Sequence, residues 1–239
     1  MNKINFDLLQ GENLNFKNLF SICVGKVFSN KIEFLDNIEG FENWDTDLEV
    51  GKLILDERAF NVNYLGSVTH NDNMWFSAEL EKNIPDEYIK LLIECRKAMK
   101  NYGVKDFYPI KVKTDEKITG EVLAILCAAF SPNKDVVLFN GKAEGVNLYM
   151  LVNNFEENPE LIKNSVNNIS AEKFIPRVLE VISKYDLNHK LMIKSFLLDN
   201  NCDFNEEENL LIGNFPNEIK VKFTFDEEGK MLNAESQLN

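Results

Sequence analysis

Apolar residues recur every three or four positions near the start of the chain, which is the spacing of one helix face. This stripe consists of Phe16, Leu19, Phe20, Cys23, Val24, Val27, Phe28 and Ile32. It predicts an amphipathic helix over about residues 15–36. A second stripe of the same period lies between Pro85, which suits a first helical turn, and Gly103, which suits a helix end. It predicts a second helix.

The residues between these two helices alternate between apolar and polar, as strands do. The strand candidates are residues 44–48, 52–55, 61–69 and 74–81. Glu49-Val50-Gly51 separates the first two candidates, and the polar run His70-Asn71-Asp72-Asn73 separates the last two. Gly51 suits a hairpin turn in the first separator, and the second consists of four polar turn formers, so the sequence predicts two β-hairpins.

The pattern continues with one more helix and three more strands. Thr114 can cap a helix over about residues 116–130. The strand candidates are residues 107–113, 135–140 and 146–152. Because hairpins dominate this order, we predict an α+β fold with a mainly antiparallel sheet and packed helices.

A polar connector at residues 153–158 marks the predicted boundary between a domain of residues 1–155 and a unit of residues 156–239. We expect this second unit to be smaller, helical and closed by a β-hairpin. One short helix is expected from Pro159, and another is capped by Ser170.

The helix that follows Ser170 contains Pro176, so it either kinks at that residue or begins there. A further helix is expected over residues 187–200. Residues 219–225 then alternate, and the run Asp226-Glu227-Glu228-Gly229 turns the chain back. This tail predicts the hairpin.

The chain is strongly acidic, with 39 Asp and Glu against 26 Lys and Arg and a net charge of −13. This balance argues against nucleic acids and anionic membranes as direct partners, because both are bound by clustered Lys and Arg. The longest apolar run, Val122 to Phe130, is too short to span a bilayer, and the first residues lack the apolar core of a signal peptide. We therefore expect a cytoplasmic protein.

The acidic residues are concentrated in two stretches that contain no base, residues 33–51 and 199–208. We predict that a basic protein partner binds there. The candidate binding residues are Glu39, Glu42, Asp45, Asp47, Glu49, Asp203, Glu206, Glu207 and Glu208. Whether the two stretches merge in space is left open by the sequence.

Catalytic and metal-binding signatures are missing from the sequence. The four cysteines form no CxxC pair and only two histidines are present, so we predict no metal site and no cofactor, and we expect buried free thiols. No phosphate-binding glycine loop, nucleophile elbow or HExxH helix occurs. The absence of these motifs favours a binding protein over an enzyme without excluding an enzyme.

One set of residues resembles a known family. The pattern is Trp44-x-x-Asp47-Leu48-x-x-Gly51-x-Leu53, then Leu65-Gly66-Ser67, then Trp75, then a helix ending in Tyr102-Gly103. It resembles an uncharacterised bacterial domain family whose members carry a W-x-x-D-L-x-x-G hairpin, an L-G strand and a tryptophan-rich strand. The resemblance covers about residues 15–152. It departs from the family after Trp75, where Phe76-Ser77-Ala78-Glu79 replaces the further tryptophans, and it implies nothing about function.

The two tryptophans and two glycines of this pattern are read first as structural residues. Trp44 and Trp75 can close a sheet against a helix. Gly51 suits a hairpin turn, and Gly66 suits a bulge or a close backbone contact.

Three functions remain open. The first is a non-enzymatic, acidic protein-binding module, such as an inhibitor or immunity protein, that uses complementary charge. The second is a small-ligand sensor or small enzyme with a pocket formed by Trp75, Tyr64 and His70. The third is a DNA-mimic inhibitor, which requires both acidic stretches to form one stripe.

Overall fold

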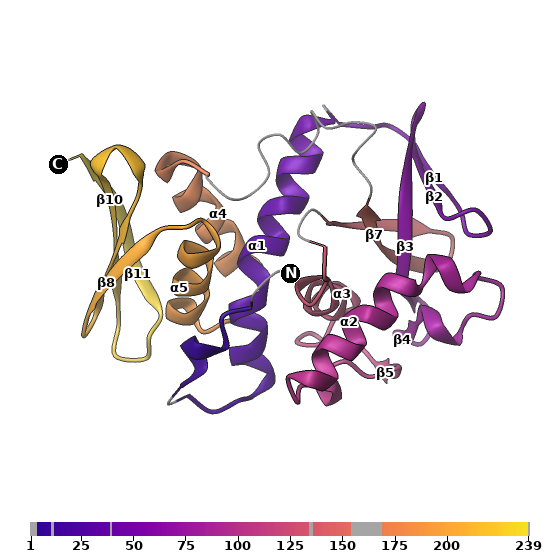
Figure 1. The fold of residues 1–239 in the computed structure, drawn as a ribbon, viewed down its shortest axis with the longest axis horizontal. Helices are drawn as coiled ribbons and strands as arrows, with labels where there is room; N and C mark the ends of the chain where they lie inside the picture. Colours follow the sequence, from indigo (N-terminus) through magenta and orange to yellow (C-terminus); the bar gives the residue numbers. More distant parts are fainter. Residues whose placement is uncertain (1–3, 11, 39, 134–135, 154–168, 239) are drawn as a thin grey trace. The chain divides into compact units, whose positions relative to one another are not determined.

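The computed structural model describes residues 4–10, 12–38, 40–133, 136–153 and 169–238. The chain divides into two compact units, shown in Figure 1. Among the described residues, unit 1 contains residues 30–153, and unit 2 contains residues 4–29 and 169–238. The helix α1 (Phe16–Asn37) therefore begins in unit 2 and ends in unit 1.

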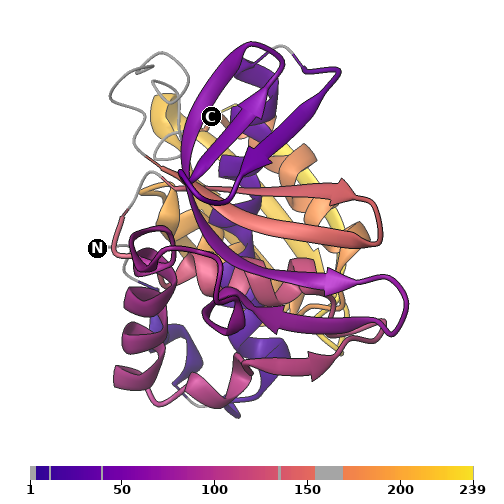
Figure 2. The same ribbon diagram turned by 90° about the vertical axis from the view of Figure 1, so that its right-hand side faces the viewer.

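Unit 1 is built on a seven-stranded antiparallel sheet, which Figure 2 shows nearly face on. Its strands are β1 (Trp44–Asp47), β2 (Lys52–Leu55), β3 (Arg58–Thr69), β4 (Met74–Ser77), β5 (Lys111–Lys113), β6 (Val137–Ala143) and β7 (Val146–Asn153). The long strand β3 lies at the centre. It pairs with β2 and then β4 along one edge and with β7 along the other. The predicted hairpins β1–β2 and β3–β4 are confirmed, and so is the α+β class. The strands predicted at residues 135–140 and 146–152 pair with each other as β6 and β7.

Two helices complete unit 1 together with the last part of α1. They are α2 (Lys90–Asn101) and α3 (Gly120–Ala129). The predicted start of α3 was wrong, because Thr119 and not Thr114 caps this helix: its side chain accepts the N–H of Val122. The hydroxyl of Thr114 instead donates to the carbonyl of Asn73.

The end of α1 is fixed in unit 1 by Lys31. Its ammonium group lies 2.6 Å from Glu121 at the start of α3 and 2.6 Å from Asn140 on β6. One side chain thus ties a helix, a second helix and a strand together.

Two glycines receive the two tryptophan rings of unit 1. A Cβ atom at Gly66 would lie 2.7 Å from the Trp75 ring and 2.4 Å from the carbonyl oxygen of Phe76. A Cβ atom at Gly141 would lie 2.4 Å from the Trp44 ring. The register of β3 against β7 shifts between Tyr64 and Gly66, so the bulge predicted at Gly66 is confirmed.

Trp75 is the most deeply enclosed ring of unit 1, with none of its surface exposed. It lies edge-on to Tyr108, with ring centroids 5.9 Å apart, and 5.6 Å from the centroid of Tyr149. The structural reading of Trp75 is therefore confirmed: the ring fills the space that the missing side chain of Gly66 leaves.

We expect Gly66→Ala to lower the unfolding free energy of unit 1 by about 2–3 kcal/mol, because the added methyl group meets backbone as well as a buried ring. Urea denaturation followed by tryptophan fluorescence measures this, since both tryptophans lie in unit 1. Gly145→Asn is the control: its position is open, its φ is +75°, and asparagine tolerates that conformation. Equal destabilisation by the two substitutions would contradict the close approach at Gly66.

Unit 2 combines helices with a second, four-stranded antiparallel sheet. Besides the first part of α1, its elements are η1 (Phe6–Leu9), α4 (Ala171–Lys184), α5 (His189–Asp199), β8 (Asp203–Glu207), β9 (Leu210–Asn214), η7 (Pro216–Glu218), β10 (Ile219–Phe225) and β11 (Met231–Leu238). The predicted hairpin is β10–β11. The pair β8–β9 was not predicted, because nearly every residue of β8 is exposed and its sequence shows no apolar alternation.

The structure of α4 shows that the helix does not begin at Pro176. The helix begins after Ser170 and continues through Pro176 to Lys184. The short helix expected at Pro159 falls outside the described residues.

Phenylalanine rings form the core of unit 2. Phe174 of α4 stacks on Phe196 of α5 with centroids 4.5 Å apart, and Phe215 and Phe223 pack edge-on against Phe174. Gly25 of α1 contacts Phe196 so closely that a Cβ atom there would lie 2.8 Å from it.

The first part of α1 also bonds directly to α5. The Ser195 hydroxyl donates to the carbonyl of Ile22 at 2.7 Å, and the N–H of Asn188 donates to the Ser21 hydroxyl at 2.9 Å. These contacts explain why residues 4–29 belong to unit 2, whereas the predicted division assigned all of residues 1–155 to one domain.

One carboxyl group of unit 2 is held in an unfavourable position. Burial raises the pKa of Asp199, at the end of α5, to about 7, although Lys26 of α1 opposes the shift. The folded state therefore binds a proton that the unfolded chain releases near pH 4. The resulting stabilisation is fully present below pH 4 and is lost as the pH rises through 7.

We expect Asp199→Asn to raise the unfolding free energy at pH 8 by about 2 kcal/mol and to change it little at pH 4. Urea denaturation followed by circular dichroism at both pH values tests this. Asp203→Asn, at an exposed neighbouring position, is the control and should leave the pH dependence unchanged. If the wild-type protein is as stable as the Asp199→Asn variant at pH 8, the Asp199 carboxylate does not destabilise the fold and the prediction fails.

Candidate functional site

The part of the first acidic stretch that follows α1 continues into a charged hairpin of unit 1, which we call the acidic hairpin (residues 42–57). It contains β1, β2 and their turns. Its exposed acids are Glu42, Asp45, Asp47, Glu49, Asp56 and Glu57. Lys52 is the one basic residue in these sixteen positions. The predicted residue Glu39 lies outside the described residues.

The alternation of β1 points its aspartates outward. Trp44 packs against Gly141 and Phe139. The Thr46 hydroxyl lies 2.7 Å from the Tyr64 hydroxyl and donates to the carbonyl of Lys52. Trp44 and Thr46 face the rest of unit 1. Because side chains alternate along a strand, Asp45 and Asp47 project together from the opposite face of β1.

Two of these carboxylates also hold the hairpin in shape. Asp47 accepts the N–H groups of Glu49 and Val50 in the turn, which closes at Gly51 with a φ of +61°. Asp56 accepts the N–H of Asn43 at 2.9 Å. The turn predicted at Gly51 is confirmed.

The charge of the acidic hairpin is not neutralised within the described part of the chain. Lys52 bonds to the side chain of Asn61, and Arg58 donates to the carbonyl of Ile38. Among the described residues, no carboxylate of the acidic hairpin takes part in an ion pair. Its negative charge therefore faces solvent.

The second acidic stretch lies in unit 2 and is partly neutralised. Glu206 pairs with Lys190 at 2.7 Å and also with Lys194. Partial burial opposes ionisation, but the two ammonium groups hold the pKa of Glu206 below its ordinary value. Asp203, Glu207 and Glu208 are exposed. The two acidic stretches belong to different units, so they form no continuous patch within either unit.

The predicted pocket of Trp75, Tyr64 and His70 is not present as a joint ligand-facing surface. Trp75 has none of its surface exposed, and Tyr64 only 3%. The Tyr64 hydroxyl is held inside by Thr46 and by the carbonyl of Asp47. His70 lies on the exposed β3–β4 turn, where Nε2 is 3.0 Å from Asn147. The two rings belong to the core because Tyr64 lies in the stretch of β3 that is buried on both faces, and Trp75 lies on the buried face of β4.

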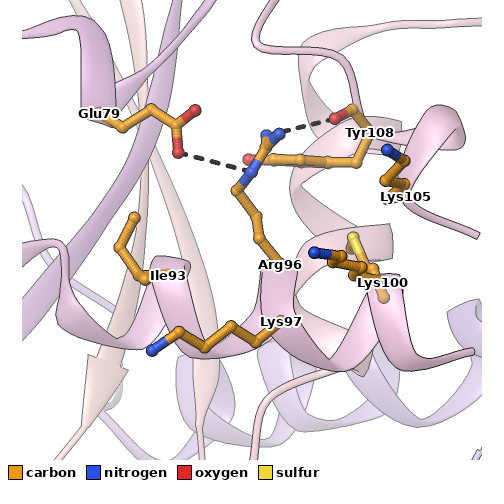
Figure 3. A pocket seen from close by; sticks show the side chains of 8 residues that line it. Glu79, Ile93, Arg96, Lys97, Lys100, Lys105 and Tyr108 are labelled. Atoms are coloured by element: carbon orange, nitrogen blue, oxygen red, sulfur yellow. Dashed lines mark hydrogen bonds and ion pairs between the residues drawn. The ribbon is translucent and has the colours of Figure 1, made fainter.

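A different cavity, of about 220 Å³, opens beside α2 (Figure 3), and we call it the basic pocket. It is lined by Glu79, Ile93, Arg96, Lys97, Met99, Lys100, Lys105 and Tyr108. Four of these eight residues are basic, in a protein whose net charge is −13.

Three neighbouring elements build the basic pocket. Ile93, Arg96, Lys97 and Lys100 follow the i, i+3, i+4, i+7 spacing, which places them on one face of α2. Gly103, with a φ of +72°, ends the helix and brings in η4 (Lys105–Phe107) and then Tyr108. Glu79 comes from η2 (Ala78–Leu80), directly after β4.

Arg96 lies in the wall of the basic pocket and contacts two other residues of that wall. Its Nε lies 3.4 Å from a carboxylate oxygen of Glu79, and Nη1 donates to the carbonyl of Tyr108 at 3.3 Å, as Figure 3 shows. The guanidinium group also lies 5.5 Å from the centre of the Tyr108 ring. Glu79 and Tyr108 thus fix Arg96 in place.

The three lysines of the basic pocket are exposed. In the part of the chain that the structure describes, none of Lys97, Lys100 and Lys105 has an ion-pair partner. Their attraction for an anion is therefore unused within unit 1.

The wall residue Tyr108 connects this cavity to the core. The ring is buried, and burial raises the pKa of its hydroxyl well above the ordinary value, so the group stays protonated. It donates to the carbonyl of Leu65 on the bulge of β3. Tyr108 serves as a rigid apolar surface and not as a proton-transfer group.

The sequence prediction missed the basic pocket, although a signal was present. Residues 90–113 contain seven of the 26 Lys and Arg residues and only two acids. This local charge of +5 is the reverse of the net charge of the chain. A charge count in short windows finds it.

Metal ligands and membrane-spanning helices are both missing from the described residues. In that part of the chain, no group of three or more His, Cys, Asp or Glu side chains is arranged to hold a metal ion. Among the described helices, none has the length and apolar character needed to cross a bilayer. All four cysteines are buried and free, as predicted.

Comparison with known proteins identifies the family. Residues 17–155 match DUF6882, a family of unknown function, and the chain belongs to it. The predicted resemblance to an uncharacterised domain family is thus confirmed. The chain is also 27% identical over 105 residues to the tRNA modification GTPase MnmE of Desulforamulus reducens. That match covers 44% of this chain and only 23% of the length of the GTPase. No solved structure is significantly similar.

Proposed function

We propose that this member of the DUF6882 family is a cytoplasmic binding protein whose acidic hairpin docks onto a basic surface of a partner protein. The observation that supports this proposal is the set of six exposed carboxylates on the hairpin that form no ion pair in the described part of the chain. Such a surface raises the rate at which a basic partner is captured. An inhibitor or immunity-type role is consistent with this mode of binding.

The acidic hairpin is favoured over the second acidic stretch as the docking surface. Charged edge strands also prevent pairing with other chains, and β1 is an edge strand. However, Glu49, Asp56 and Glu57 lie in turns and not on the strand edge, so edge protection does not account for them. In unit 2, Glu206 already has two lysine partners.

We expect the combined substitutions Glu42→Gln, Asp45→Asn, Asp47→Asn and Glu49→Gln to slow association with a captured partner about tenfold at low salt. The amide introduced by Asp47→Asn retains an oxygen that can accept the turn N–H groups, so the hairpin should keep its shape. The measurement is a tagged pull-down from host lysate at two salt concentrations, followed by surface plasmon resonance with the purified partner.

A second four-acid variant serves as the matched control. It carries Glu81→Gln, Asp106→Asn, Glu116→Gln and Glu144→Gln, which are exposed positions of unit 1 outside the acidic hairpin. Both variants change the net charge from −13 to −9, since each removes four carboxylates. A partner whose association slows equally with both variants responds to overall charge and not to the hairpin.

The same assay examines the DNA-mimic alternative. If the captured partner binds duplex DNA, and DNA displaces this protein from it, the carboxylates substitute for phosphates. If DNA has no effect on binding, the DNA-mimic hypothesis is rejected and the protein-binding proposal stands.

A further inference from the structure

We infer that the basic pocket binds a phosphate monoester carried on a small apolar or aromatic body. The residues of the basic pocket are different from those that carry the proposed function. The acidic hairpin and the basic pocket are formed by separate segments of unit 1, residues 42–57 and residues 79–108.

The charges of the basic pocket select for a dianion. Lys97, Lys100 and Lys105 all line the cavity and have no ion-pair partner within the described part of the chain, and each ammonium group carries three N–H donors. A phosphate monoester has a charge near −2 at neutral pH and three acceptor oxygens. A carboxylate offers one charge and two oxygens, so it satisfies fewer of these donors.

Arg96 differs from the three lysines because it already has partners in the wall of the pocket. Two of its five N–H donors are directed at Glu79 and at the carbonyl of Tyr108, and the Glu79 carboxylate offsets its charge. The lysines therefore carry the positive charge that no described group offsets, and lysine binds phosphate as a mobile point charge. The Glu79 carboxylate lies at the same cavity and repels any anion that enters.

The remaining wall of the basic pocket is apolar. Ile93, which is half-buried, is its accessible part, whereas Met99 and Tyr108 line the cavity with only 1% of their surface exposed. Ile93 and the alkyl chains of the lysines provide a surface for a ring or an alkyl group attached to the phosphate. The volume of about 220 Å³ is below the range of about 300–1,000 Å³ that is usual for larger ligands, so a small molecule fits best.

Titration of the full chain with phenyl phosphate, followed by isothermal titration calorimetry, tests this inference. We expect binding that weakens as salt is added, and a loss of affinity of at least about tenfold when Lys97, Lys100 and Lys105 are each replaced by Gln. Replacing Lys113, Lys117 and Lys142 by Gln removes the same charge from exposed positions outside the pocket and should change the affinity less than about twofold.

Two further measurements separate a built site from general attraction. Glu79→Gln should strengthen phenyl phosphate binding about threefold, because it removes the repelling carboxylate while keeping an amide beside Arg96. Inorganic phosphate should bind more weakly than phenyl phosphate, because it makes no contact with the apolar wall.

Equal losses in the two triple-lysine variants, or no binding of phenyl phosphate up to millimolar concentration, would overturn the inference. Neither result bears on the acidic hairpin, whose four substituted acids lie outside the basic pocket. Circular dichroism of each variant confirms that the exposed substitutions leave the fold intact.

Discussion

The architecture of unit 1 depends on the close contact between tryptophan rings and glycine backbone. Gly66 admits Trp75, and Gly141 admits Trp44, at distances that any side chain at either glycine would prevent. Both candidate surfaces follow from these contacts. Trp44 anchors β1, so Asp45 and Asp47 of the same strand project outward. Trp75 packs against Tyr108, and Tyr108 forms the wall of the basic pocket and holds Arg96.

The net charge of −13 conceals a division of charge within unit 1. The acidic hairpin, with six acids and one base, carries −5, whereas residues 90–113, with seven bases and two acids, carry +5. Opposite charges on one unit attract different partners, and at physiological salt their fields reach only about 8 Å. The two proposals therefore call for partners of opposite charge: a basic protein for the acidic hairpin and a small anion for the basic pocket.

Much of the fold was predictable from the sequence, because hairpins and amphipathic helices have local signals. The turn at Gly51 and the bulge at Gly66 follow from the special conformations that glycine allows. The pair β8–β9 was missed because an exposed strand has no apolar alternation. The placement of residues 4–29 in unit 2 was missed because packing partners that are distant in sequence leave no local pattern. Most acids of the acidic hairpin were found because residues 33–51 contain seven acids and no base. The basic pocket was missed because its residues come from three elements, and because the alternative pocket hypothesis was placed on Trp75, Tyr64 and His70, of which the two large rings are core.

The extent of the family match has a physical consequence for how these surfaces are studied. DUF6882 covers residues 17–155 and so includes nearly all of α1, but the first part of this helix is buried within unit 2. Phe20, Val24 and Phe28 are each at most 3% exposed, and Gly25 is in contact with Phe196 of α5. A chain limited to the family region would expose this apolar face to water, at about 25 cal/mol for each Å² of apolar surface. Such an exposed face would itself attract apolar partners. Binding to the acidic hairpin or the basic pocket should therefore be measured on the full chain, in which residues 169–238 cover the first half of α1. In the shorter chain, binding to the exposed apolar face would add to the signal.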